Sequence, residues 1–225
     1  MKISELIEKN FLIAKFAKKA SNNFGGKKNK PMITISREFG SGGSIIAEKV
    51  AKKLGKTWKA YHSEIVDKIA KTSRLEKKVI DEIDEGDIPI INQIIGDFFG
   101  KKYVNLSSYS KHLVKIITSI AFKGYAVIVG RGGNFLLPDS LKVRIISNME
   151  DRVKTIMQYK KVKRDMAIEM IEASDKKRAE FTKQLYNHSN RNAYHFDLVI
   201  KTGGILDEDD IVDTIVHLTK RKFNL

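Results

Sequence analysis

A cluster of glycines lies between a predicted strand and a predicted helix, and it restricts the fold more than any other feature of the chain. The β-rich run 31–36 leads into Gly40-Ser41-Gly42-Gly43-Ser44, and an apolar helical pattern continues from Ser44 to Leu54. Residues without a β-carbon allow a chain to turn tightly while several backbone N–H groups converge on one point. The first turn of the helix adds free N–H donors and the positive end of its dipole. We therefore predict that this turn binds a phosphate group, with a plain glycine-rich connection as the alternative.

Further strands and helices alternate along the chain. Strands are predicted at 125–129, 141–146 and 196–200, and helical patterns occupy 63–69, 90–99, 113–122, 163–187 and 207–219. Strands that alternate with helices usually form a parallel sheet that is covered on both faces. The sequence thus predicts an α/β fold. At the N-terminus it predicts a helix at 3–20 and a linker at 21–30.

The composition excludes several classes of function. The chain of 225 residues contains no cysteine, which rules out disulfides, zinc–thiolate sites and thiol chemistry. No apolar run reaches the roughly 18 to 20 residues of a membrane span. The first residues include acids and no small-residue cleavage site, so we expect no secretory signal and a cytoplasmic location. The five histidines lack metal-ligand spacing, and the acidic segment 81–87 is more typical of a solvated helix end than of a cation loop, so no protein-held metal site is predicted.

A strong excess of positive charge indicates an anionic ligand. The chain has 42 Lys and Arg residues against 27 Asp and Glu residues, a formal net charge of +15. Such a field attracts nucleotides, nucleic acids and anionic lipids. The lysines are spread over the whole chain, without an arginine-rich arm or a basic stretch interleaved with aromatic residues. A small phosphorylated ligand explains this charge, and we expect no dedicated nucleic-acid partner.

A second glycine cluster follows the clearest predicted strand. Residues 130–133 read Gly-Arg-Gly-Gly directly after the strand at 125–129. Ligands of open parallel sheets bind beyond the carboxyl ends of the strands, and an arginine can bind two phosphate oxygens at once. Arg131 is therefore a candidate phosphate contact, with pairing to a carboxylate at the edge of the core as the alternative.

Several segments together resemble the cytidylate kinase-like family. They are ITISREFGSGG at 33–43, VIVGRGGNFLLPDSLKVRII at 127–146, Asp175-Lys176-Lys177-Arg178 on the charged helix, and YHFDLVIKTG at 194–203. The resemblance covers about residues 31–220. It implies a P-loop kinase fold with a five-stranded parallel sheet and helices on both faces. The implied domain at 31–225 contains a helical acceptor-binding insert at 61–123 and a helical lid at 160–190, and it follows the N-terminal helix and linker at 1–30.

The resemblance also implies an activity, namely phosphoryl transfer from ATP, with Mg²⁺, to a small phosphorylated acceptor such as the nucleoside monophosphate CMP. Arg131 would contact the phosphate of the acceptor. Arg178, together with Lys176, would reach the moving phosphoryl group from the lid, and Asp175 would orient the acceptor or the arginine. The ATP phosphates would be held by Gly40, Ser41, Gly42, Gly43 and Ser44. The oligomeric state stays open.

The glycine loop departs from the Walker A loop of nucleoside monophosphate kinases. Arg37 stands in place of the first glycine, Gly43 in place of the lysine, and Ile45 in place of the threonine, although Ser44 lies next to it. The missing lysine is the cation that normally meets the transferred phosphoryl group. We predict that Arg37, the only cation inside the motif, helps to replace it. The alternative is that Arg37 pairs with Glu38 or another acid and braces the loop.

Further departures concern the acceptor side and the lid. Val129 and Gly132 replace aspartates on either side of Gly-Arg, Ile171 replaces a lid arginine, and His62 replaces an aspartate of the insert. Arg152 and Arg164 either join the lid cations or are solvated helical charges. Two functions stay open. We favour a kinase, because other cations can supply the electrostatics of phosphoryl transfer; the alternative is a nucleotide-binding regulatory module with little or no turnover.

Overall fold

The computed structural model describes residues 30–72 and 88–225. The predicted helix at 3–20, nearly all of the predicted linker, and the acidic segment 81–87 lie outside these residues. The chain divides into two compact units. The sheet unit combines residues 31–66 with 125–225, and the helical unit includes residues 67–124.

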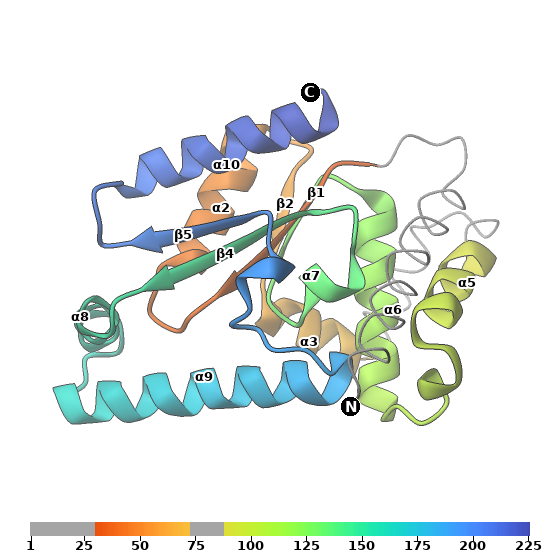
Figure 1. The fold of residues 1–225 in the computed structure, drawn as a ribbon, viewed down its shortest axis with the longest axis horizontal. Coiled ribbons are helices and arrows are strands. Elements are labelled where there is room, and N and C mark those ends of the chain that lie inside the picture. Colours follow the sequence, from red (N-terminus) through yellow and green to blue (C-terminus); the bar gives the residue numbers. More distant parts are fainter. Residues whose placement is uncertain (1–29, 73–87) are drawn as a thin grey trace. The chain divides into compact units, whose positions relative to one another are not determined.

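A five-stranded, all-parallel sheet forms the centre of the sheet unit (Figure 1). Ile35 of the central strand pairs with Val129 on one side and with Val143 on the other. The predicted α/β fold with a five-stranded parallel sheet is therefore confirmed. In the spatial order β2-β3-β1-β4-β5, the strands are β1 (Met32–Arg37), β2 (Lys59–Tyr61), β3 (Ala126–Val129), β4 (Leu141–Ser147) and β5 (Leu198–Thr202).

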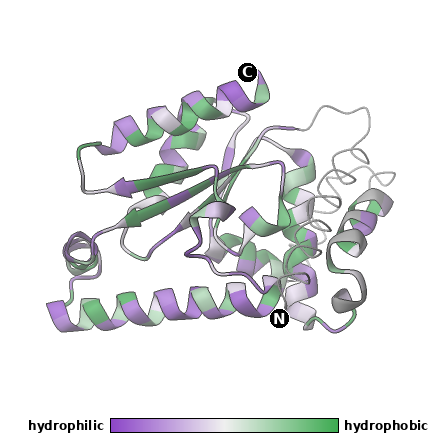
Figure 2. Cartoon of the chain, in the orientation of Figure 1, coloured by the Kyte–Doolittle hydropathy of each residue, from purple (hydrophilic) through white to green (hydrophobic). Residues whose placement is uncertain are grey.

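Two helices, α2 (Gly43–Leu54) and α10 (Glu208–Phe223), cover one face of this sheet (Figure 1). Residues two apart along a strand point to the same face, and alternate residues such as Ile33 and Ile35 of β1 are buried against these helices. Figure 2 shows hydrophobic residues concentrated in the strands, whereas α10 carries hydrophilic residues as well. The burial of this apolar face fixes the register of the sheet, and with it the position of each loop at the strand ends.

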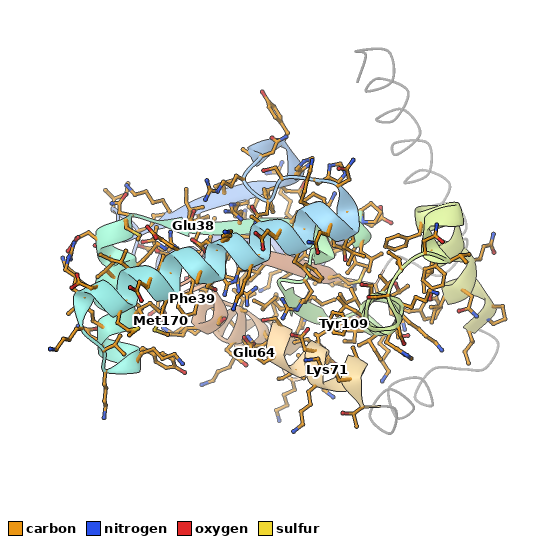
Figure 3. All side chains as sticks on the ribbon, turned by 90° about the horizontal axis from the view of Figure 1, so that it is seen from below. Glu38, Phe39, Glu64, Lys71, Tyr109 and Met170 are labelled. Carbon is orange, nitrogen blue, oxygen red and sulfur yellow. The ribbon has the colours of Figure 1, made fainter. Side chains whose placement is uncertain are left out.

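A second, smaller core joins α8 (Met149–Lys160) to α9 (Arg164–Tyr186). Val153 and Ile156 of α8 pack there with Ala167 and Ile171 of α9. Phe39, which follows β1, also packs against this core, and it lies beside α9 in Figure 3. The glycine loop is thereby attached through an apolar contact to α9. The remaining described helices of the sheet unit are α7 (Gly133–Leu136), a 3₁₀ turn at Ala193–His195 and the first residues of α3 (Ser63–Lys71).

The helical unit contains α5 (Ile88–Phe99), a 3₁₀ turn at Gly100–Tyr103 and α6 (Ser108–Lys123). The hydroxyl of Ser107 caps α6 by accepting from the N–H of Ser110 at 3.2 Å. Near this end, the hydroxyl of Tyr109 donates to Asp67 at 2.7 Å, and the Nζ of Lys71 lies 5.9 Å from the centre of the Tyr109 ring (Figure 3). These contacts attach the end of α3 to α6. No helix in the described part of the chain is both long and apolar enough to cross a membrane.

Candidate phosphate-binding site

The glycine loop turns sharply between β1 and α2. Gly40 and Gly42 have φ angles of 85° and 78°, in the left-handed region that glycine adopts without strain. A β-carbon at Gly40 would lie 3.0 Å from the carbonyl oxygen of Arg152, whereas one at Gly42 would meet no atom within 4 Å. The first intrahelical bond of α2 runs from the N–H of Ile46 to Gly42, which leaves the preceding N–H groups of the helix free to bind an anion.

The two serines of the loop have different surroundings. The side chain of Ser41 is buried, and its hydroxyl donates to the carbonyl oxygen of Glu38 at 2.9 Å and to that of Ile145 at 3.4 Å. The carbonyl oxygen of Ser41 accepts from Thr202 at 3.2 Å. Ser41 therefore ties the loop to β4 and β5. Ser44, in contrast, is exposed in the first turn of α2, where its hydroxyl can reach a ligand.

Buried arginines hold the first residues of the loop. Glu38 accepts from the N–H of Ser147 at 3.0 Å, and its carboxylate oxygens lie 3.8 Å from Arg144 and 3.6 Å from Arg152. The Nε of Arg152 also donates to the carbonyl oxygen of Phe39 at 2.8 Å. Burial lowers the pKa of Arg144, and the nearby charge of Glu38 opposes that shift. This network fixes the loop backbone from the side of β4 and α8.

Asp175 joins the network from α9. One of its carboxylate oxygens accepts from the N–H of Phe39 at 3.0 Å, and the other contacts the guanidinium of Arg152. The same carboxylate thus binds a backbone amide of the loop and a cation that braces the loop. In this conformation Asp175 fixes α9 to the glycine loop.

Arg178 lies one turn further along α9, on the same face. Its guanidinium donates to the carbonyl oxygen of Arg37 at 3.1 Å and lies 5.4 Å from the centre of the Phe39 ring. Burial lowers the pKa of Arg178, although the charge of Asp175 opposes this shift; a guanidinium nevertheless stays charged in proteins. Within the described residues Arg178 forms no ion pair, so its charge is not neutralised by direct contact with an acid.

Arg37 connects the end of β1 with the second glycine cluster and with α3. One Nη donates to the hydroxyl of Ser63 at 2.9 Å, and the guanidinium lies against Gly130. Partial burial alone would raise the pKa of Glu64. That pKa is instead lowered, because its own N–H and the Ser63 hydroxyl bind the carboxylate and because Arg37 is close. Arg37 is therefore a buried cation at the end of the central strand.

The second glycine cluster places Arg131 close to Arg178. Gly130, Arg131 and Gly132 have φ angles of 82°, 52° and 68° in succession, and a left-handed residue other than glycine is uncommon and often found at functional sites. The guanidinium of Arg131 lies 5.3 Å from the centre of the Phe181 ring, and its charge contributes to the lowered pKa of Arg178. A β-carbon at Gly132 would lie 2.1 Å from the ring of Tyr186. The structure thus brings Arg131 and Arg178, which were predicted from separate motifs, into one region.

Departures from the family pattern at two buried positions have a physical explanation. Val129 is fully buried in the main core, and Ile171 is 1 % exposed in the core between α8 and α9, so that an acid or an arginine would lose its solvent there. The Nε2 of His62 lies 2.6 Å from a carboxylate oxygen of Glu48. Arg164 is exposed and forms a bidentate pair with Glu150. Of the two further candidate lid cations, only Arg152 contacts the loop.

The fold and this site define an α/β protein with the P-loop kinase-like architecture. The parallel order β2-β3-β1-β4-β5 places the glycine loop after the central strand, and a long helix packs beside that loop. A family model described as the cytidylate kinase-like family matches residues 32–204. The chain belongs to the cytidylate kinase-like family, as the sequence resemblance predicts.

Two solved structures are similar to this chain. An uncharacterized protein from Eubacterium ventriosum has a TM-score of 0.68 and 23% sequence identity, and the match covers 85% of this chain and 99% of that chain. The structure of TT1252 from Thermus thermophilus has a TM-score of 0.49 and 15% identity, with 86% and 98% of the two chains covered. No curated protein matches the sequence. The first likeness supports the fold.

Proposed function

We propose that the protein is an ATP-dependent phosphotransferase acting on a nucleoside monophosphate, with CMP as the first candidate. The observation that carries the proposal is the gathering of arginines from three separate elements beside the glycine loop. They are Arg37 at the end of β1, Arg131 after β3 and Arg178 on α9. The transition state of phosphoryl transfer spreads negative charge over the moving group, and fixed cations around that group lower its energy.

Each part of the site has a task in the proposed reaction. The open space at Gly42 and the free N–H groups at the start of α2 receive the triphosphate of ATP. Arg131 contacts the phosphate of the acceptor, and Arg178 stabilises the phosphoryl group in transfer. Asp175 holds Arg152 and the loop backbone in place, and thereby keeps α9 beside the loop.

The proposed site has few protein ligands for Mg²⁺. In the described part of the chain no three His, Asp or Glu side chains lie close enough together to hold a metal ion, and Val129 is buried where an acid would stand. Mg²⁺ keeps several water ligands and binds readily to nucleotide phosphates. We therefore infer that Mg²⁺ would enter the site bound to ATP. The exposed Ser44 hydroxyl is the protein group that would hold it, and the bound ion would supply positive charge to the nucleotide phosphates.

The chemistry of the acceptor favours a monophosphate over an alcohol. In the proposed step an acceptor oxygen bonds to the γ-phosphorus while the bond from that phosphorus to the β–γ bridging oxygen breaks, and ADP leaves. A phosphate oxygen is already deprotonated at neutral pH, whereas an alcohol needs a base. Two carboxylates beside the arginines, Asp175 and Glu64, are occupied by hydrogen bonds to loop or helix groups.

Two observations favour the second candidate, a nucleotide-binding regulatory module. Gly43 stands where a lysine normally contacts the transferred phosphoryl group. The Asp175 carboxylate already accepts a hydrogen bond from the N–H of Phe39 in the loop, so this N–H is not available to a phosphate. A loop of this kind can bind a nucleotide and respond by moving α9, without turnover. Either function agrees with the cytoplasmic location that we predict, because ATP is abundant there.

An acceptor panel separates these functions. The purified full chain is incubated with Mg²⁺, γ-labelled ATP and one acceptor at a time: CMP, dCMP, UMP, AMP, GMP, shikimate or a small sugar. We expect label to appear on a nucleoside monophosphate, with CMP preferred. Label on a non-nucleotide would show that the acceptor pocket serves another substrate. If a non-hydrolysable ATP analogue binds but no acceptor is labelled, the kinase proposal is wrong and the regulatory module replaces it.

A further inference from the structure

Arg37 and Gly43 are in direct contact across the glycine loop. A β-carbon built on Gly43 would lie 2.7 Å from the Cβ of Arg37 and 3.1 Å from its Cγ. Carbon atoms that are not bonded need about 3.5 to 4.0 Å. The Cβ of Arg37 cannot move aside, because it is fixed by the backbone of the central strand, which pairs with β4 through Arg37 itself. Any side chain at position 43 therefore conflicts with the present path of the Arg37 side chain.

A second glycine makes room for the other end of this side chain. A β-carbon at Gly130 would lie 2.0 Å from an Nη of Arg37. The other Nη donates to Ser63, and only 9 % of Arg37 is exposed. The two glycine clusters are thus coupled physically, since Arg37 passes from Gly43 in the first cluster to Gly130 in the second. Its guanidinium ends against the residue directly before Arg131, next to the proposed acceptor phosphate.

We propose that glycine and cation have exchanged positions in this loop. In a standard Walker A loop the residue at the place of Arg37 is glycine and the residue at the place of Gly43 is lysine. Here the strand supplies the cation through Arg37, and position 43 is glycine because the Arg37 side chain fills its space. The role of Arg37 toward the transferred phosphoryl group rests on the proposed function. The packing exchange between positions 37 and 43 does not.

A double-mutant cycle tests the exchange. The four proteins are the wild type, Arg37→Gly, Gly43→Lys and the double variant Arg37→Gly/Gly43→Lys, which carries the residues of the standard loop at both positions. Melting temperature and the affinity for a non-hydrolysable ATP analogue with Mg²⁺ are measured for each. Lys56→Gly is the matched control, because it removes one positive charge from the exposed turn beyond the opposite end of α2.

The exchange predicts compensation between the two positions. Arg37→Gly should weaken binding of the analogue by about tenfold or more, since a charge-assisted contact is lost, whereas Lys56→Gly should leave it nearly unchanged. Gly43→Lys alone should lower the melting temperature by about 4 °C or more. In the Arg37→Gly background the same substitution should lower it much less, and it should restore most of the lost affinity.

Independent effects of the substitutions at positions 37 and 43 on melting temperature would overturn the inference. If the losses of melting temperature in the two single variants simply add in the double variant, positions 37 and 43 are not exchanged. Should Gly43→Lys fail to fold, Gly43→Ala in both backgrounds provides the same comparison, because its β-carbon meets the same atom. If the wild type binds no ATP analogue, the proposed function fails, while the melting temperatures still decide the exchange. If compensation appears in stability but not in affinity, Arg37 is a packing residue and its proposed electrostatic role is wrong.

Discussion

Glycines at the candidate site are required for two different physical reasons. Gly42 needs a left-handed backbone and leaves open space in front of the loop, whereas Gly43 and Gly132 make room for the side chains of Arg37 and Tyr186. A ligand is expected only at the first kind of position, because at the second kind the space is already filled. The surroundings of each glycine therefore distinguish Gly42, which can bind a ligand, from Gly43 and Gly132, which make room for neighbouring side chains.

Substitution of Gly42 tests the binding role at this scale. Gly42 and Gly55 flank the two ends of α2, both have positive φ angles, and a β-carbon added at either would meet no atom within 4 Å. Gly42→Val and Gly55→Val should each lose about 1–2 kcal/mol of stability through backbone strain. Only Gly42→Val should abolish binding of a non-hydrolysable ATP analogue in a calorimetric titration. Equal affinity of the two variants would show that phosphate does not lie at Gly42.

The sequence alone predicts the glycine turn of the site but not the residues that hold this turn in place. A turn between a strand and a helix depends on residues that are close in sequence. The spacing of Gly40 and Gly42 between the two patterns is therefore enough to predict the turn. Arg152 binds the carbonyl oxygen of Phe39 across 113 positions of sequence, and nothing in its own helical segment distinguishes it from the solvated Arg164. Only the packing of α8 against the loop makes that distinction.

At the scale of elements, segments with a clear residue pattern were predicted close to their observed positions, including the four-residue strand β3 (Ala126–Val129), whereas a short strand without such a pattern was missed. The charged helix predicted at 163–187 is α9 (Arg164–Tyr186), and the strand predicted at 141–146 is β4 (Leu141–Ser147). The edge strand β2 (Lys59–Tyr61) was not predicted from its own residues. It has only three residues and no apolar alternation, and its place comes from pairing with β3.

The attachment of α9 to the loop gives a prediction at this scale. Asp175→Asn keeps an oxygen that can accept from Phe39 but removes the charge that compensates the buried Arg152. Breaking one side of such a pair should destabilise the protein by about 2–4 kcal/mol in a chemical denaturation experiment. Asp165→Asn, in the exposed first turn of the same helix, should lose about 0.3–1 kcal/mol. Similar small losses in both variants would contradict the bracing role of Asp175.

At the scale of the sheet unit, chain topology explains why distant residues meet. The chain leaves β1 toward β2 at one edge of the sheet and leaves β4 toward β5 at the other edge. Ligands of open parallel sheets bind where such connections diverge, beyond the carboxyl ends of the strands. Arg37, Arg131 and Arg178 all come to this end. From the sequence, this rule predicts that the site lies at the carboxyl ends of the strands. Which cations face one another there depends on how α9 packs against the loop, and the rule does not predict that packing.

Arg178 tests the central claim that this end of the sheet transfers phosphoryl groups. Phosphate transfer from ATP to the best acceptor of the panel is measured for the wild type, Arg178→Ala and Arg164→Ala, together with the affinity of each protein for the ATP analogue. Arg164 is the matched control, because it is an exposed arginine of the same helix. We predict that Arg178→Ala lowers kcat by about 100-fold or more, changes ATP affinity by less than about tenfold, and that Arg164→Ala changes neither. Equal losses of turnover and ATP affinity in Arg178→Ala, or unchanged turnover, would contradict the claim.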